Sequence, residues 1–366
     1  MVKEMHVDIR ARDLGFTERV VKESARCSGL VLGRVVAQYR ELYRVATEHR
    51  DVLAEVSGKF RFTSAALADY PAVGDFVMID RDEGRAGNAV IHHVLARRSV
   101  FARRAAGTAH NVQVIAANID TVFICMSLNN DFNLRRLERY LSITWDSGAT
   151  PVVVLTKSDL CDVLPDRLLE IKQVALGVDV IVTTSMTKDG HVAILDYIRT
   201  GQTVAFVGSS GVGKSTLINH LLGADVIPTR ELRGDDRGRH ATTRRELITI
   251  PSGGAVIDTP GMRELGLESA DLARAFSDIE GLASGCKFRD CTHEAEPGCA
   301  VTQAIDDAGI SASRLASYRK LKREATYEGL DSRQIESQKV HEMYSSHGGI
   351  KNVRALKKSR QDREQK

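Results

Sequence analysis

The sequence lacks any apolar run that approaches eighteen residues, so we expect no membrane-spanning segment. It has no recognisable signal peptide and only six cysteines in 366 residues, so we expect a cytoplasmic protein without disulfide bonds. An excess of one charge is also missing, because the formal net charge is only +3. A chain of this length, with 43% apolar residues, is expected to form two or three domains with substantial cores.

The small net charge hides an uneven distribution. Residues 311–366 contain 14 Lys and Arg but only 7 Asp and Glu. Some of these basic residues fall on an expected helix: Arg314, Arg319, Lys320, Lys322 and Arg323. The rest lie mainly in a basic tail, residues 331–366. Such residues form either a solvated surface or a face that binds nucleic acid.

The most specific motif is a glycine-rich loop between an expected strand at 204–207 and an expected helix at 214–222. Its glycines allow backbone N–H groups to converge on phosphate oxygens at the start of the helix. Lys214 would reach the outer phosphates and assist catalysis, and Ser215 would bind Mg²⁺. The alternative is a glycine-rich turn without a ligand. The residues predicted to bind nucleotide here are Gly208, Ser209, Ser210, Gly211, Val212, Gly213, Lys214, Ser215 and Thr216.

A second motif indicates that the base is guanine. Thr156-Lys157-Ser158-Asp159 follows a β-branched strand at 151–155, and ligands of open α/β sheets bind at such strand ends. The Asp159 carboxylate can accept from both N1–H and the amine of guanine, whereas adenine would leave it unpaired, which disfavours an ATPase. Thr156 stands where Asn is usual, so the sequence leaves open whether this side chain bonds to the phosphate-binding loop. Ser185, after a strand at 178–182, is expected nearby.

The order of these motifs is inverted. In ordinary small GTPases the guanine motif follows the phosphate-binding loop, and here it precedes it. The chain is therefore expected to trace the nucleotide-binding sheet in a circularly permuted order.

Further along the chain, Asp258 ends an expected strand and would hold Mg²⁺ through water, while Gly261 would donate to the γ-phosphate. The polar loop 233–245 is expected to be a switch, in which either Thr242 or Thr243 completes the Mg²⁺ shell. Met262 stands where small GTPases carry a water-orienting glutamine, so we expect slow hydrolysis by the protein alone. His240 is the candidate to replace that glutamine; an ordinary exposed histidine is the alternative.

Near the C-terminal end, Cys286, Cys291, His293 and Cys299 fall within fourteen residues. Three thiolates and one imidazole fill a tetrahedral Zn²⁺ shell and leave no open position, which predicts one structural zinc ion. Core cysteines or a disulfide are the alternatives.

Before the guanine motif, residues 29–104 show short alternating stretches separated by turns, which predicts a five-stranded barrel. We interpret it as an OB-fold that binds RNA; another small barrel remains possible from periodicity alone. The expected units are an extension of unassigned function (1–28), the barrel (29–105), the GTPase domain (112–270), a mainly helical zinc domain (271–330) and the basic tail (331–366). The fold class is therefore multidomain α/β.

The permuted order together with the zinc motif resembles the RsgA/YjeQ family of circularly permuted, ribosome-dependent GTPases. The matching segments are Ala117–Asp120, Gly238–Thr243, Asp258–Gly261 and Cys286–Val301, and the resemblance spans about residues 29–325. It implies an N-terminal OB-fold, a central GTPase and a C-terminal zinc domain. It further implies a role in late maturation of the small (30S) ribosomal subunit, contact with its 16S rRNA, stimulated GTP hydrolysis, and a hydrolytic role for His240.

Two other functions are compatible with the same residues. A GTP-binding scaffold with little hydrolysis fits Met262, and a permuted GTPase acting on the large subunit or another RNA fits the nucleotide motifs. We expect a monomer that binds GTP and GDP and no membrane.

Overall fold

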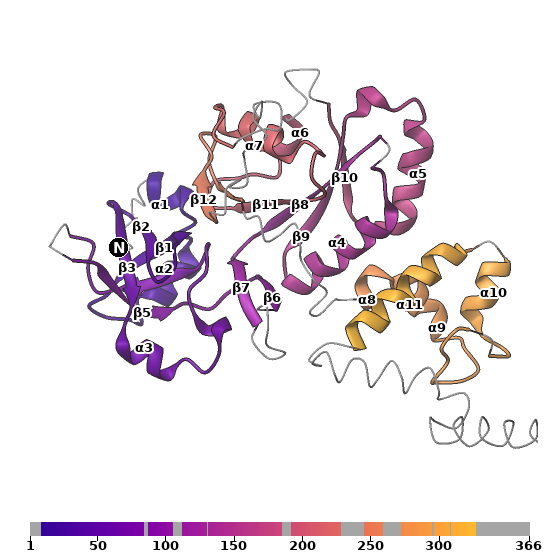
Figure 1. Cartoon of the computed structure of the whole chain (residues 1–366), viewed down its shortest axis with the longest axis horizontal. Helices are drawn as coiled ribbons and strands as arrows, with labels where there is room; N and C mark the ends of the chain where they lie inside the picture. Colours follow the sequence, from indigo (N-terminus) through magenta and orange to yellow (C-terminus); the bar gives the residue numbers. More distant parts are fainter. Residues whose placement is uncertain are drawn as a thin grey trace, which may run out of the picture.

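The computed structural model describes residues 9–83, 87–104, 112–129, 131–184, 192–227, 245–258, 272–294, 296–307 and 309–326. Three bodies follow one another along the chain: a small barrel, an α/β domain and a helical module. The barrel and the helical module lie on opposite sides of the α/β domain (Figure 1). The predicted multidomain α/β fold class is confirmed.

The first body is a closed five-stranded barrel, as predicted. Its strands are ordered β1-β2-β3-β5-β4, and β4 pairs back with β1. All neighbours are antiparallel except β3 and β5. Apolar side chains such as Val35, Val45 and Ile91 fill the interior with essentially no exposure. The strands are β1 (Val31–Gln38), β2 (Tyr43–Thr47), β3 (Asp51–Val56), β4 (Phe76–Ile79) and β5 (Ala89–Val94), with α3 (Gly58–Thr63) and η1 (Leu67–Asp69) between β3 and β4.

Two short helices precede the barrel, α1 (Ile9–Asp13) and α2 (Glu18–Ser24). They bury Leu14, Phe16 and Val20, and the Phe16 ring meets the ring of Phe76 edge-on at 6.1 Å. The N-terminal extension thus contributes to the core.

A two-stranded hairpin joins the barrel to the α/β domain. Strand β6 (Val100–Arg104) pairs with β7 (Val112–Ala117) and forms a sheet of its own. The backbone of Gly74 passes close to this hairpin, since a Cβ there would lie 2.1 Å from the Ala117 carbonyl oxygen. With φ at +94°, only glycine suits this position.

The central sheet has the order β10-β9-β8-β11-β13-β12. All strands are parallel except β12, which runs antiparallel to β13. Strand β11 follows β10 in the chain but lies between β8 and β13, so the predicted permuted order is confirmed. The carboxyl ends of β9, β11 and β13 therefore meet at one edge. The strands are β8 (Thr121–Ser127), β9 (Thr150–Thr156), β10 (Asp179–Val182), β11 (Thr203–Val207), β12 (Glu246–Thr249) and β13 (Ala255–Asp258).

Helices cover this sheet, and the longest of them is α4 (Leu134–Ser147). Asn133 caps its start by accepting from the Arg136 N–H at 3.0 Å, and Gly148 ends it at φ 85°. Leu137 and Leu141 point into the core. The other helices are η2 (Ser158–Leu160), α5 (Leu164–Val174), α6 (Val192–Leu195) and α7 (Lys214–Leu222).

The last body is helical, as predicted, and packs against α4. Its helices are α8 (Leu272–Ala275), α9 (Ser277–Ala283), α10 (Ala300–Asp306) and α11 (Ala312–Thr326). The Arg274 guanidinium lies 3.7 Å from the centre of the Trp145 ring of α4. One continuous apolar cluster runs from the N-terminal helices through the sheet to this module. Among the described residues, no helix is both long enough and apolar enough to cross a membrane.

The structure corrects the interpretation of one basic residue. Arg314 was expected on an exposed basic helix, but its side chain is only 4% exposed. It donates to Asp278 of α9 and, at 2.9 Å, to Glu138 of α4. Arg314 therefore belongs to the joint between module and GTPase domain and not to a nucleic-acid-binding surface. The expected tail, residues 331–366, lies outside the described residues.

Candidate nucleotide site and metal centre

The glycine-rich loop connects β11 to α7 at the edge of the sheet where the parallel strands end. Gly208 has φ +140°, and a Cβ there would lie 2.3 Å from the Cys125 carbonyl oxygen of β8. Only glycine allows the loop to leave the sheet along this path. The following residues, Ser209 to Gly213, lead to the first turn of α7, whose N–H groups point along the helix axis towards the loop.

Lys214 lies inside this loop. Its side chain is buried, and its ammonium group donates to the carbonyl oxygens of Gly208 at 2.8 Å and Ser209 at 2.6 Å. The loop thus encloses a cation at the helix N-terminus, where Ser215 and Thr216 occupy the first turn. Both sources of positive potential favour a bound phosphate.

The guanine motif is held directly against this loop. Thr156 is the last residue of β9, and its hydroxyl donates to the Val212 carbonyl at 2.6 Å. The Thr156 hydroxyl therefore makes the side-chain hydrogen bond to the phosphate-binding loop that could not be decided from the sequence. Lys157 has the left-handed φ of 58°, which is uncommon for a residue with a side chain and occurs where a site constrains the backbone. Two motifs 56 residues apart therefore converge.

Asp159 has a partner that the sequence motifs did not reveal. The Thr184 hydroxyl, two residues after β10, donates to the Asp159 Oδ1 at 2.5 Å. The sequence pattern pointed only to Ser185 in this loop, and Ser185 lies outside the described residues. The signal that could have found Thr184 is its place directly after a β-branched strand adjacent to β9.

A second neighbour of the phosphate-binding loop was also missed. Asp131, between β8 and α4, accepts a hydrogen bond from the Ser209 hydroxyl and forms an ion pair with Arg136. Burial raises the pKa of the Asp131 carboxyl, but these two hydrogen bonds outweigh burial and hold the pKa below its ordinary value.

Of the residues expected to handle Mg²⁺ and water, the structure places two. Ser215 is the second residue of α7, and Asp258 ends β13, whose neighbour β11 leads into the phosphate-binding loop. The two are brought to the same edge of the sheet. The others lie outside the described residues, namely His240, Thr242, Thr243, Gly261 and Met262.

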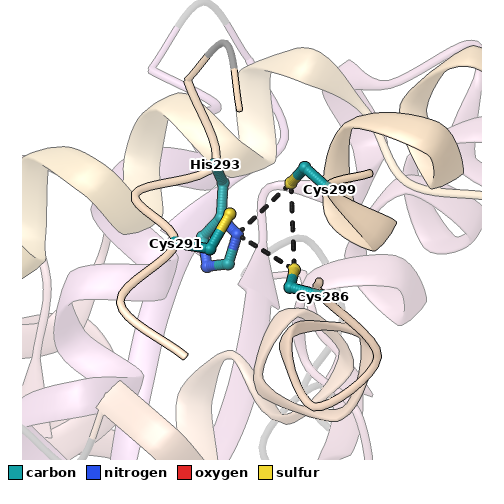
Figure 2. A group of neighbouring side chains, drawn as sticks. All are labelled: Cys286, Cys291, His293 and Cys299. Atoms are coloured by element: carbon teal, nitrogen blue, oxygen red, sulfur yellow. Dashed lines mark hydrogen bonds between the residues drawn. The ribbon is translucent and has the colours of Figure 1, made fainter. Parts of the chain in front are cut away.

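The four residues of the cysteine motif converge in the helical module, with their side chains turned towards one another (Figure 2). The His293 Nδ1 lies 3.6 Å from the Cys286 sulfur and 3.5 Å from the Cys299 sulfur, and the two sulfurs are 3.9 Å apart. The ligand atoms of all four residues lie within 4.8 Å of one another. The cluster can therefore hold a metal ion.

The local backbone structure fixes the positions of two residues of this cluster, Cys299 and His293. Cys299 caps α10 by accepting from the Thr302 N–H, and His293 sits in a left-handed turn at φ 61°. Burial raises the pKa of Cys299, but hydrogen bonds, among them that from Thr302, outweigh it and lower the pKa to about 6. The disulfide alternative fails, because all six cysteines are free and the Cys286 and Cys299 sulfurs are far beyond the S–S bond length of about 2.05 Å.

Comparison with known proteins identifies the family. The model of the RsgA GTPase family matches residues 94–268. The small ribosomal subunit biogenesis GTPase RsgA 2 of Lactiplantibacillus plantarum is 49% identical over 341 residues, which cover 93% of this chain and 96% of that protein. The chain belongs to the RsgA family. A further relative, the RsgA of Methanosarcina acetivorans, is 43% identical, with 90% of each chain covered. The resemblance inferred from sequence is thus confirmed.

Solved structures agree with this assignment. YjeQ from Thermotoga maritima matches with a TM-score of 0.60 and 26% identity over 81% of this chain and 99% of that one. YloQ, described as a circularly permuted GTPase, matches with a TM-score of 0.58 and 24% identity over 82% of this chain and 96% of its own. The RsgA family fold therefore extends over most of the chain.

Proposed function

We propose that this protein is a GTPase that acts in biogenesis of the small ribosomal subunit. The observation that carries the proposal is 49% identity, over 93% of the chain, to a protein named as such a GTPase. The geometry supports it, because the guanine motif and the phosphate-binding loop are tied together through Thr156 and Val212. A GTP molecule has to contact both segments at once.

Within this site, residues 208–216 hold the phosphates and residues 156–159, together with Ser185, hold the base. Asp159 selects guanine, and Thr184 orients its carboxylate. Ser215, Asp258 and one of Thr242 or Thr243 hold Mg²⁺, which neutralises charge on the phosphates when bound. Lys214 and the N–H groups of the loop and Gly261 stabilise the charge that develops on the γ-phosphate. His240 replaces the missing glutamine at Met262.

The helical module would hold one structural Zn²⁺ through Cys286, Cys291, His293 and Cys299. A tetrahedral zinc centre, with Zn–S of about 2.3 Å and Zn–N of about 2.0 Å, requires S···N separations of about 3.5 Å and S···S separations of about 3.8 Å. The separations between Cys286, His293 and Cys299 match both values. When bound, the ion would link the segments before and after the turn at His293 and would replace a core that the segment 286–299 is too short to form.

The barrel and the zinc domain are RNA-binding units that contact 16S rRNA on two sides of the nucleotide domain. The opposed positions of the two bodies support this arrangement (Figure 1). We place the functional units at residues 1–28, 29–105, 112–270, 271–330 and 331–366, and we expect a cytoplasmic monomer. GTP orders the switch loop 233–245, and contact with a correctly formed subunit triggers hydrolysis and release.

The test is GTP hydrolysis by the purified protein alone, with small subunits and with large subunits, at physiological salt. We expect slow turnover alone and strong stimulation by small subunits only. Stimulation by large subunits would contradict the proposed partner. Nucleotide-dependent binding to small subunits without any stimulation would favour the scaffold function, for which Met262 is the supporting observation.

A further inference from the structure

The loop between β8 and α4 lies next to the guanine motif, because β8 is the strand between β9 and β11, and it contacts the phosphate-binding loop. Asn129 holds this loop by accepting from the Ser127 hydroxyl at 2.8 Å and from the Asp131 N–H at 3.0 Å. The Asp131 carboxylate then accepts from the Ser209 hydroxyl. Ser209 is thus held at both ends, since its carbonyl also accepts from Lys214 at 2.6 Å. The position of the second residue of the phosphate-binding loop is therefore set by Asp131 and Lys214.

A carboxylate at this place is electrostatically unfavourable for the ligand. Asp131 adds negative charge beside a loop that has to bind a polyphosphate, and like charges repel over several ångströms in a partly buried site. Arg136 offsets that charge, because its Nη1 lies 2.8 and 2.9 Å from the two Asp131 oxygens. Asp131 precedes α4, and Arg136 lies in the first turn of that helix, where its N–H also donates to the Asn133 cap. Lys157 of the guanine motif acts on Asp131 in the same direction through its charge.

We propose that Asp131 is a positioning residue of the nucleotide site, which holds Ser209 of the phosphate-binding loop, and that Arg136 is required to cancel its charge. This inference rests on the proposed GTP site. It makes a signed prediction: removing Arg136 exposes bound phosphates to an uncompensated carboxylate, and removing the Asp131 charge as well restores binding.

The chain offers a matched control on the same helical turn. Arg135 is exposed and forms no ion pair with any described residue. Arg135→Gln therefore removes the same charge from the same turn of α4 without changing the partner of Asp131. A general loss of positive potential would affect both arginine variants equally, whereas the proposed pairing affects only one.

The experiment measures equilibrium binding of fluorescent GTP and GDP to full-length protein with Mg²⁺. Arg136→Gln is expected to weaken both nucleotides about ten-fold, a typical coupling for charges in contact, while Arg135→Gln stays within about two-fold of the wild type. The double variant Asp131→Asn/Arg136→Gln is expected to return to within about three-fold. Turnover at saturating GTP is expected to stay near the wild-type value in the control Arg135→Gln, which lies outside the Asp131–Ser209 contact.

Two results would overturn the inference: a double variant as weak as Arg136→Gln, or equal losses in Arg135→Gln and Arg136→Gln. If Arg136→Gln fails to fold, as judged by thermal denaturation without nucleotide, Arg136→Lys keeps the charge but loses the two-pronged contact and is expected to give an intermediate affinity. A wild-type protein that binds neither nucleotide would instead contradict the proposed function, and this inference with it.

Discussion

The GTPase domain is joined to its two neighbours through one buried arginine at each joint, and the two arginines differ in what surrounds them. Arg34 of β1 lies at the barrel joint and Arg314 of α11 at the joint with the helical module. Each guanidinium stacks on a phenylalanine, Arg34 on Phe76 at 4.7 Å and Arg314 on Phe276 at 4.8 Å. Both arginines therefore make the same kind of contact with an aromatic ring, and they differ in the groups to which they donate hydrogen bonds.

Among the residues that the structure describes, Arg34 donates only to neutral acceptors. It donates to the carbonyl oxygens of Leu14 at 2.8 Å and Gly74 at 3.2 Å, and to the Thr203 hydroxyl at 2.7 Å. Burial without a hydrogen-bonded carboxylate lowers the pKa of Arg34 to about 10. The barrel joint also contains backbone contacts, such as the strand pairing of Ala37 with Glu246, so it does not depend on this cation alone.

Arg314 is bound by two carboxylates. It donates twice to Asp278, at 2.6 and 2.8 Å, and once to Glu138 at 2.9 Å. Burial lowers the pKa of Arg314, but these partners outweigh it and raise the pKa above the ordinary value. In the described part of the chain this joint is made of side chains packed on α4. The comparison shows that the barrel joint combines strand pairing with hydrogen bonds to neutral groups, whereas the buried arginine of the other joint is compensated by two carboxylates.

The largest effect is expected from removing the proposed zinc ion, because the helical module would need it to form the structure that presents Arg314. Chelation, or Cys299→Ser, is expected to cost most of the module's stability, since structural zinc supplies about 10–16 kcal/mol in small zinc domains. Amide hydrogen exchange should show lost protection in α9 to α11 and unchanged protection in β1 to β5. Cys27→Ser, outside the cluster, is the control and should change neither. Retained protection after chelation would contradict a structural metal.

The next largest effect is expected from Arg314→Met. It leaves the buried Glu138 carboxylate without its partner, which costs about 3–5 kcal/mol in comparable buried pairs. Chemical denaturation of metal-loaded protein measures the loss. Arg289→Met, at an exposed position of the same module, removes the same charge and should change the free energy of unfolding by less than about 0.5 kcal/mol.

A smaller effect is expected from Arg34→Met at the barrel joint. No carboxylate loses a hydrogen-bonded partner there, so the loss is that of unsatisfied carbonyl and hydroxyl acceptors, about 1–3 kcal/mol. The same denaturation measurement tests it. A loss as large as that of Arg314→Met would show that the charge environment does not distinguish the two joints.

Sequence reasoning succeeded where the signal is local. The phosphate-binding loop, the guanine motif and the cysteine motif each lie within a short segment, so their residues could be named before their arrangement was known. Barrel strands with clear alternation were found as well. Strand β3 was not, because the apolar Leu53 lies on its exposed face between Asp51 and Glu55 and obscures the alternation, and the pairing of β6 with β7 left no recognisable turn signal.

Contacts between distant segments could not be predicted. The basic composition of α11 was visible, but the acidic partners of Arg314 come from 36 and 176 residues away. Likewise Asp131 meets Ser209 across 78 residues, and nothing in either segment marks the other. A charge count shows which residues need partners, and only the fold shows which ones have them.

The smallest expected effect is a difference between the two joints in how the free energy of unfolding depends on pH. Burial raises the pKa of Glu138 above its ordinary value of 4.5, although Arg314 opposes the shift. A carboxyl with a raised folded pKa stabilises the protein below that ordinary value and loses this contribution as the pH rises through the folded pKa. The free energy of unfolding of the wild type minus that of Glu138→Gln should therefore be largest near pH 4.5 and decrease towards neutral pH. Protonation of the metal ligands is common to both proteins and cancels in the difference. At the barrel joint the charge of Arg34 opposes the raised pKa of the buried Asp75, so the same difference calculated for Arg34→Met should not decrease as the pH rises. A difference for Glu138→Gln that is flat, or grows with pH, would mean that Arg314 dominates the electrostatics of Glu138 and that burial does not.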